Sequence, residues 1–137
     1  MRKKIIFPLM MILSLLALFV AACASQAPAS PAGPTEVHVK LSEFKIEMDK
    51  TSIPAGPVKF LFDNAGAITH EVVLEAAGAD DAPFEANGEE SEVEDIETGK
   101  SATLEWTIDE PGQYQLACHI EGHFEAGMVT TFTVTAP

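Results

Sequence analysis

Basic residues are scarce in this chain, and a helical sequence pattern is missing. Lysine and arginine total 8 against 21 acidic residues, so the formal net charge is −13. A surface this acidic disfavours nucleic-acid binding, and we expect no nucleic-acid partner. No segment shows the apolar spacing of an amphipathic helix, and no internal repeat is visible. The fold must therefore be built from strands.

Cysteine is scarce too, with only Cys23 and Cys118. Arg2 and two lysines precede an uncharged run over residues 5–22, which ends in "FVAAC". This run is long enough to be weighed as a membrane span, but the pattern resembles a bacterial lipobox. We predict a lipoprotein signal peptide over residues 1–22, lipid attachment at Cys23, and a location outside the cytoplasm on the bacterial cell membrane, facing the periplasm or the cell exterior.

Residues 23–34 are rich in Pro, Ala and Ser and are predicted to be a flexible tether. The remaining residues 35–137 suit one small domain. Three of the eight basic residues lie in the signal, so its removal changes the net charge from −13 to −16. If Cys23 carries lipid, Cys118 is left without a disulfide partner. We expect Cys118 to be buried, metal-bound or catalytic.

Apolar residues in the domain recur with period two, which predicts half-buried strands. Turn signals at 53–57, 63–66, 97–100 and 109–112 separate them. We predict an all-β fold of about seven strands, an antiparallel Greek-key β-sandwich or barrel. The acidic residues 76–97 lack strand alternation and are expected to form a long, solvated loop with at most one helical turn. The core candidates outside the site are Phe44, Ile46, Met48, Trp106 and Tyr114, and His38 is expected at the surface.

The stretch "CHIEGHFEAGM" at 118–128 concentrates residues that bind metals. A zinc protease would need two histidines at i and i+4 on a helix, with glutamate directly after the first. Here Glu121 is misplaced and Gly122 weakens a helix. A catalytic thiol would need a base and an orienting third group, and the latter is not evident.

Copper fits this stretch better. A blue-copper centre uses one cysteine, two histidines and a weak axial methionine. Cys118, His123 and Met128 can supply three of these ligands from one strand-loop-strand turn. His70, at the start of an apolar strand in "DNAGAITHEVVLE", is the candidate for the fourth. Taken alone, His70 would be read as a surface histidine.

These motifs give the domain its resemblance to the cupredoxins of the plastocyanin and azurin type. The carrying phrases are "DNAGAITHEVVL" and "PGQYQLACHIEGHFEAGM". The ligand spacing is similar to that of rusticyanin and auracyanin, and "EGHFEAGM" looks most like small bacterial cupredoxin-like copper-binding proteins. The resemblance implies one type 1 copper ion that cycles between Cu(I) and Cu(II), held by His70, Cys118, His123 and Met128.

Two positions depart from that resemblance. Several cupredoxins carry Asn or Ser after the first histidine, where this chain has Glu71, although the backbone N–H of residue 71 can still donate to Cys118. His119 is an extra imidazole. Since neighbouring side chains on a strand point to opposite faces, it should face away from the metal. Glu121 and Glu125 are expected to be solvent-facing.

The functional expectation is a single-electron carrier that works as a monomer. Its partner would be a redox protein such as a basic cytochrome or an oxidase, guided by the acidic loop. Electrons would pass at the edge of His123, within a contact patch of Ile120 and Phe124. The alternative is copper storage, delivery or tolerance. We expect no enzymatic activity, because four histidines without a His-x-His pair cannot build a trinuclear copper centre.

Overall fold

The computed structural model describes residues 33–137, and every regular element in this range is a β-strand. The predicted signal peptide, Cys23 and most of the tether lie outside the described residues. Within residues 33–137, no helix has the length and apolar character needed to cross a membrane. The strands are β1 (Thr35–Ser42), β2 (Lys45–Met48), β3 (Ser52–Pro54), β4 (Gly56–Asn64), β5 (His70–Ala76), β6 (Glu85–Ala86), β7 (Glu89–Glu90), β8 (Glu92–Ile96), β9 (Ser101–Ile108), β10 (Gly112–Ala117) and β11 (Val129–Thr135).

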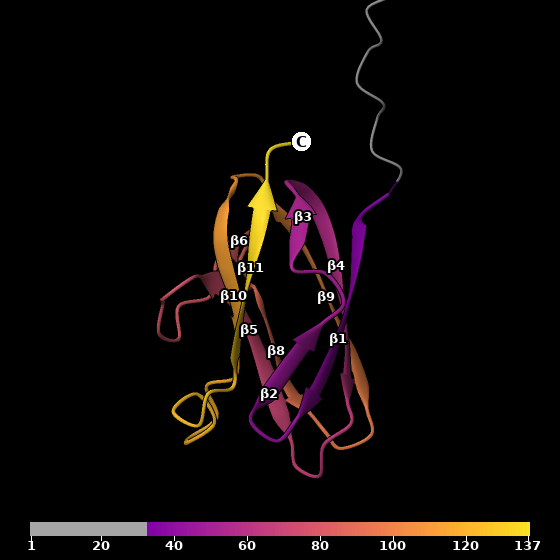
Figure 1. Cartoon of the computed structure of the whole chain (residues 1–137), viewed down its shortest axis with the longest axis vertical. Helices are drawn as coiled ribbons and strands as arrows, with labels where there is room; N and C mark the ends of the chain where they lie inside the picture. The colour runs from indigo at the N-terminus through magenta and orange to yellow at the C-terminus, as the bar shows by residue number, and fades with distance from the viewer. Residues whose placement is uncertain (1–32) are drawn as a thin grey trace, which may run out of the picture. The chain divides into compact units, whose positions relative to one another are not determined.

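Two sheets form a sandwich (Figure 1). One has the order β2-β1-β4-β9 and the other β3-β11-β10-β5-β8. The predicted all-β sandwich is confirmed, while the sheets are mixed and not purely antiparallel. β1 runs parallel to β4, and β3 runs parallel to β11. Between β1 and β4 the chain crosses to the second sheet, where it forms β3. The alternation of apolar residues predicts strands but does not show which sheet each strand joins.

Residues 33–137 form eleven strands where about seven were expected, because several of the strands are only two to four residues long. The predicted run through Phe44, Ile46 and Met48 is broken by a turn at 43–44. Ile46 is buried and Met48 is half-buried, whereas Phe44 is 45% exposed. Placing Phe44 in the core was therefore wrong. The apolar pattern shifts phase between Leu41 and Phe44, which marks this turn.

The core lies between the sheets, where the alternating residues of both inner faces meet. Phe60 of β4 packs against Phe62 and Phe132, with ring centroids 6.2 Å and 5.8 Å away. The predicted alternation of β1 is confirmed, since Val37 and Val39 are buried and His38 between them is exposed. Trp106 and Tyr114 are partly buried against this core.

The acidic segment 76–97 is more structured than the expected loop. It contains the short β6–β7 hairpin and β8, which pairs with β5. Ser91 ties it to the sheet, because its Oγ donates to the Leu74 carbonyl oxygen at 2.6 Å and accepts from the Phe84 N–H at 2.8 Å. On the outer face of β5, Val73 is 1% and Glu75 0% exposed. The segment therefore has a packing role despite its charge.

Candidate metal centre

The first segment of the centre is the turn that leads from β4 into β5. His70 is the first residue of β5. Asn64, which is 2% exposed, braces the turn before it. Its Nδ2 donates to the carbonyl oxygens of Ile68 at 2.8 Å and Ile96 at 2.7 Å, and its Oδ1 accepts from the Gly66 N–H at 2.9 Å. These bonds fix the approach of the chain to His70.

The second segment is the loop between β10 and β11. The N–H of Cys118 donates to the carbonyl oxygen of Met128 at 3.0 Å, and the N–H of Met128 donates to that of His123 at 3.0 Å. Gly122 and Gly127 adopt φ values of 83° and 96°, which a residue with a side chain resists. The loop therefore folds back so that its cysteine, histidine and methionine are close together.

The two segments bring three candidate donors together. The ligand atoms of His70, Cys118 and His123 all lie within 4.8 Å of one another, and all three residues are buried. Cys118 Sγ is 3.3 Å from His123 Nδ1, and the His70 and His123 rings have centroids 5.2 Å apart. Met128, the fourth predicted ligand, is fully buried and directly precedes β11. Strands distant in sequence thus form one compact donor cluster.

His70 supplies a test of whether a metal fits. Its ring is fully buried, yet neither Nδ1 nor Nε2 has a hydrogen-bond partner. A buried polar nitrogen without a partner is unfavourable, and such groups in native proteins commonly coordinate or bind something. Coordination would satisfy one of these nitrogens. The arrangement fits a metal ion among the three donors.

The protonation of the donors is set by burial. Burial raises the pKa of the Cys118 thiol, although the nearby backbone N–H groups of Glu71 and Ile120 act in the opposite direction. Burial, followed by the nearby His123, lowers the pKa of His70. In the metal-free protein the thiol therefore keeps its proton at neutral pH and His70 is neutral. A metal must displace the thiol proton when it binds.

Glu71 links the two ligand segments. Its carboxylate Oε1 accepts a hydrogen bond from the His119 N–H at 2.8 Å, and its own backbone N–H acts to lower the pKa of the Cys118 thiol. Donation of a hydrogen bond from the residue 71 N–H to the sulfur stays a prediction. The glutamate side chain itself supplies a tie between β5 and the residue after Cys118.

Cys118 and His119 directly follow the end of β10, and the His119 side chain makes its contacts away from the donor cluster. Its Nε2 is 3.0 Å from Oε1 of the fully buried Glu75, and its ring stacks on Phe124 with centroids 4.7 Å apart. Glu75 also accepts hydrogen bonds from Gln115 Nε2 and the Ala82 N–H, each at 2.8 Å. These hydrogen bonds lower the pKa of Glu75 against the opposing effect of burial. His119 thus belongs to a polar network beneath the 76–91 segment, outside the donor cluster.

Sequence reasoning missed two residues at the β1–β2 turn. Glu43 accepts a hydrogen bond from the Ala67 N–H, and the ring of Phe44 meets that of His123 edge-on, with centroids 5.4 Å apart. The phase shift after Leu41 signals a turn but cannot show that the turn reaches the donor cluster. Glu121 and Glu125 are exposed, in agreement with expectation.

A buried thiol, two imidazoles and a thioether are the donors of a type 1 copper centre. The β-sandwich and this donor set define the class, a protein whose site fits a single type 1 copper ion. The family model described as "Cupredoxin-like domain" matches residues 11–131, and the chain belongs to this family. Ligation by the four named residues stays a prediction.

Solved structures share the fold. Auracyanin B is 24% identical, with a TM-score of 0.62 over 80% of this chain and 93% of that chain. An auracyanin from Roseiflexus castenholzii is 21% identical, with a TM-score of 0.61 over 75% of this chain and 99% of that one. At these identities the likeness shows the fold alone.

Curated relatives match over shorter stretches. The copper-resistant cuproprotein CopI of Rubrivivax gelatinosus is 34% identical over 83 residues, which cover 53% of this chain and 48% of that protein. CopI of Pseudomonas aeruginosa is 49% identical over 39 residues, covering 28% of this chain and 22% of that protein. The chain therefore matches between about a fifth and about a half of the length of these relatives.

Proposed function

We propose that this protein is a membrane-tethered type 1 copper protein that carries single electrons outside the cytoplasm. The observation that carries the proposal is the buried group of His70, Cys118 and His123, whose donor atoms lie within 4.8 Å of one another. Bound copper would supply a one-electron couple. The chain's own contribution is to hold the donors in place while the charge at the site changes.

The positions of the donors support rapid electron transfer. Cys118 and Met128 are tied by a backbone hydrogen bond, and Glu71 links the segment of His70 to that of Cys118. Donors fixed by strand ends cannot rearrange far between the geometries that Cu(I) and Cu(II) prefer. Little rearrangement means a low barrier for gaining or losing one electron.

His123 is the donor residue closest to solvent. It is 7% exposed, whereas His70, Cys118 and Met128 are 0% exposed. The exposed large apolar side chains of residues 33–137 are Phe44 and Ile68, at 45% and 40%. Phe44 packs on His123, and Ile68 lies in the turn before His70.

Phe44 and Ile68 differ from Ile120 and Phe124, the contact patch that the sequence suggested. Ile120 and Phe124 are only partly exposed, and Phe124 stacks on His119. We place electron exit at the edge of His123, with Phe44 and Ile68 as the apolar surface that a partner would cover.

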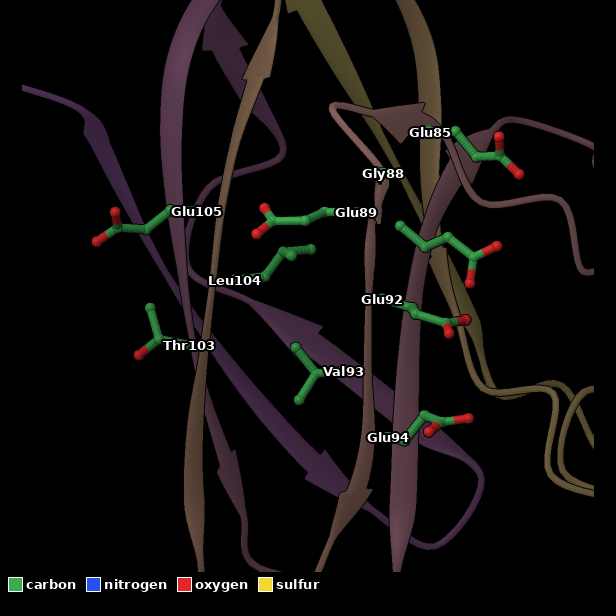
Figure 2. Close-up of a pocket in the computed structure, with 10 residues that line it drawn as sticks. Glu85, Gly88, Glu89, Glu92, Val93, Glu94, Thr103, Leu104 and Glu105 are labelled. Carbon is green, nitrogen blue, oxygen red and sulfur yellow. The ribbon is translucent and has the colours of Figure 1, made fainter.

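An acidic groove between β8 and β9 offers a second contact surface. Figure 2 shows carboxylates on both sides of it, with Val93 and Leu104 between the strands. The glutamates that line the groove are Glu85, Glu89, Glu90, Glu92, Glu94 and Glu105. Burial and the neighbouring Glu90 carboxylate raise the pKa of Glu92, as expected where negative charge is crowded. We propose that this groove attracts a basic cytochrome or oxidase to the monomeric protein.

The proposed location rests on the sequence alone. A lipid on Cys23 and the tether 23–34 would hold the domain at the bacterial membrane, facing the periplasm or the cell exterior. Mass spectrometry of the protein from membranes tests this directly. A diacylglyceryl group at residue 23, with residues 1–22 absent, is the expected result.

Spectra of the copper-loaded protein test the function. Cu(II) should give an intense blue or green thiolate-to-copper absorption, and Cys118→Ala should abolish it while the fold remains. Met128→Leu should alter the paramagnetic-resonance spectrum without removing the colour. A folded, copper-loaded protein with no thiolate-to-copper absorption would contradict the proposal.

Copper handling is a second candidate, favoured by the similarity to the copper-resistant cuproprotein CopI. The same donors would serve storage or delivery. Rapid reduction and reoxidation by a cytochrome supports the carrier, whereas rapid release of copper to an acceptor protein supports handling. In either case we propose binding or electron transfer without catalysis, since the chain contains no His-x-His pair for additional copper sites.

A further inference from the structure

The tip of the β1–β2 hairpin is unusual for its residue types. Ser42 pairs with Lys45, which leaves Glu43 and Phe44 as the two-residue turn. Phe44 has a φ of 58°, in the left-handed region that bulky residues avoid. Its ring is also 45% exposed. Glycine or asparagine would suit this turn better, so a strained and exposed phenylalanine calls for a reason outside the hairpin.

The Phe44 ring covers one of the candidate ligands. It meets the His123 ring at an interplanar angle of 86°, with centroids 5.4 Å apart. The same His123 ring lies 5.2 Å from that of His70. Despite its place on a surface loop, His123 is only 7% exposed. Phe44 is therefore one of the side chains that limit the movement of His123 and its contact with water.

Glu43 contacts the segment that leads into His70, the other candidate histidine ligand. Its Oε1 accepts from the N–H of Ala67, three residues before His70. Gly66 allows this close approach. A Cβ at residue 66 would lie 2.7 Å from Glu43 Oε1 and 3.2 Å from His70 Nε2. The carboxylate, the Gly66 backbone and the His70 ring are thus in close contact.

We propose that Glu43 and Phe44 form a clamp, contributed by a turn outside the ligand segments, which positions His70 and His123 and slows metal release. Both are positioning residues that act through the histidines. The inference rests on the copper site proposed above. It goes further by assigning metal retention to the β1–β2 turn.

The conformation of Phe44 allows the clamp to be tested apart from stability. Phe44→Gly removes the ring and relieves the positive φ, so the metal-free fold should be as stable as before or more stable. Glu43→Ala removes the acceptor for Ala67, whereas Glu43→Gln keeps an amide oxygen there. Lys45→Ala is the matched control. Lys45 is an exposed residue of the same hairpin, and its side chain forms an ion pair with Glu47.

The first measurement is the rate at which Cu(II)-loaded protein loses its thiolate-to-copper absorption in excess EDTA. Phe44→Gly and Glu43→Ala should release copper roughly 10-fold faster or more, the range seen when groups that support metal ligands are removed. Glu43→Gln and Lys45→Ala should stay close to wild type. Unchanged release from both Phe44→Gly and Glu43→Ala would overturn the clamp.

The second measurement uses metal-free protein, so the clamp can be judged even if the copper function fails. In nuclear magnetic resonance spectra, Phe44→Gly should shift or broaden the His123 ring signals. Glu43→Ala should speed hydrogen exchange at the Ala67 amide. If neither signal changes while wild type still shows the copper absorption, the clamp is wrong and the proposed function stands. If wild type lacks the absorption but both signals change, the proposed function is wrong and the positioning of the histidines by the clamp stands.

Discussion

At the residue scale, Glu71 is the main departure from the cupredoxin pattern that the sequence revealed. Its backbone N–H acts to lower the pKa of the Cys118 thiol, and its carboxylate accepts a hydrogen bond from the His119 N–H at 2.8 Å. The carboxylate therefore replaces a neutral side chain as the tie between ligand segments. It also brings a negative charge close to the thiolate.

Glu71→Gln should raise the reduction potential of the copper-loaded protein. The negative charge stabilises Cu(II) relative to Cu(I), so its removal favours the reduced state. One unit charge about 4 Å away is worth about 4 kcal/mol near a protein surface and about 1 kcal/mol in bulk water, so a more distant, partly exposed carboxylate contributes on the order of 1 kcal/mol. This corresponds to an increase on the order of 50 mV for one electron. Cyclic voltammetry measures the shift directly.

The control for this measurement is Glu110→Gln. Glu110 is an exposed residue two positions before Gly112, which begins β10 at the end away from Cys118. The Glu110→Gln substitution removes the same charge far from the Cys118 sulfur and should leave the reduction potential nearly unchanged. Equal shifts in the two variants would show that only the overall charge matters, and that Glu71 has no local effect.

At the scale of elements, the loop that joins β10 to β11 sets the spacing of three candidate ligands. It closes through hydrogen bonds from Cys118 to Met128 and from Met128 to His123. Gly127 precedes Met128 with a φ of 96°, and open space surrounds the position that its Cβ would occupy. Any cost of a side chain there is purely conformational.

Gly127→Ala should lower the free energy of unfolding by about 1 to 2 kcal/mol, the cost of placing an L-residue in the left-handed region. Copper affinity should fall too, because the strained loop can relax by moving Met128. Urea denaturation of metal-free protein and competition with a chelator measure the two effects. Gly112→Ala is the control, since its φ is not positive and its Cβ would meet Tyr114 at an ordinary 3.5 Å. Equal stability of the two variants would contradict the role of Gly127.

At the scale of the whole molecule, the acidic groove and the candidate metal centre are formed by different residues. The acidic groove lies between β8 and β9, the edge strands of the two sheets. The residues that line it include none of the four candidate ligands. A partner drawn by charge therefore needs to reach the edge of His123 from a neighbouring surface.

Salt should slow electron transfer to a basic cytochrome, with a roughly tenfold lower second-order rate at high ionic strength. Glu89→Lys combined with Glu92→Lys should weaken this salt dependence and lower the rate at low salt. Stopped-flow absorption provides the rates. Glu36→Lys combined with Glu110→Lys changes the same charge at other exposed positions. If both pairs of substitutions reduce the rate equally, the groove is not a specific docking surface.

The sequence alone was enough to predict the β-sandwich and to nominate His70, Cys118, His123 and Met128. Strand alternation and turn residues are local signals, and a cysteine, a histidine and a methionine on one short loop are rare by chance. These signals do not specify which strands pair, because pairing depends on chain crossings between sheets. The parallel pairing of β1 with β4 was missed for this reason.

Only the tertiary structure decided what surrounds the donors. It brought His70 to Cys118 across 48 residues of sequence and placed Glu43 and Phe44 beside the two histidines. It also turned part of the acidic segment into a cover for the buried Glu75. Local patterns determine which face of a strand is apolar, whereas the contacts of a turn depend on where the packed sheets carry it. The sequence thus determined the candidate donors, and the packing of the sheets decided how these side chains are held.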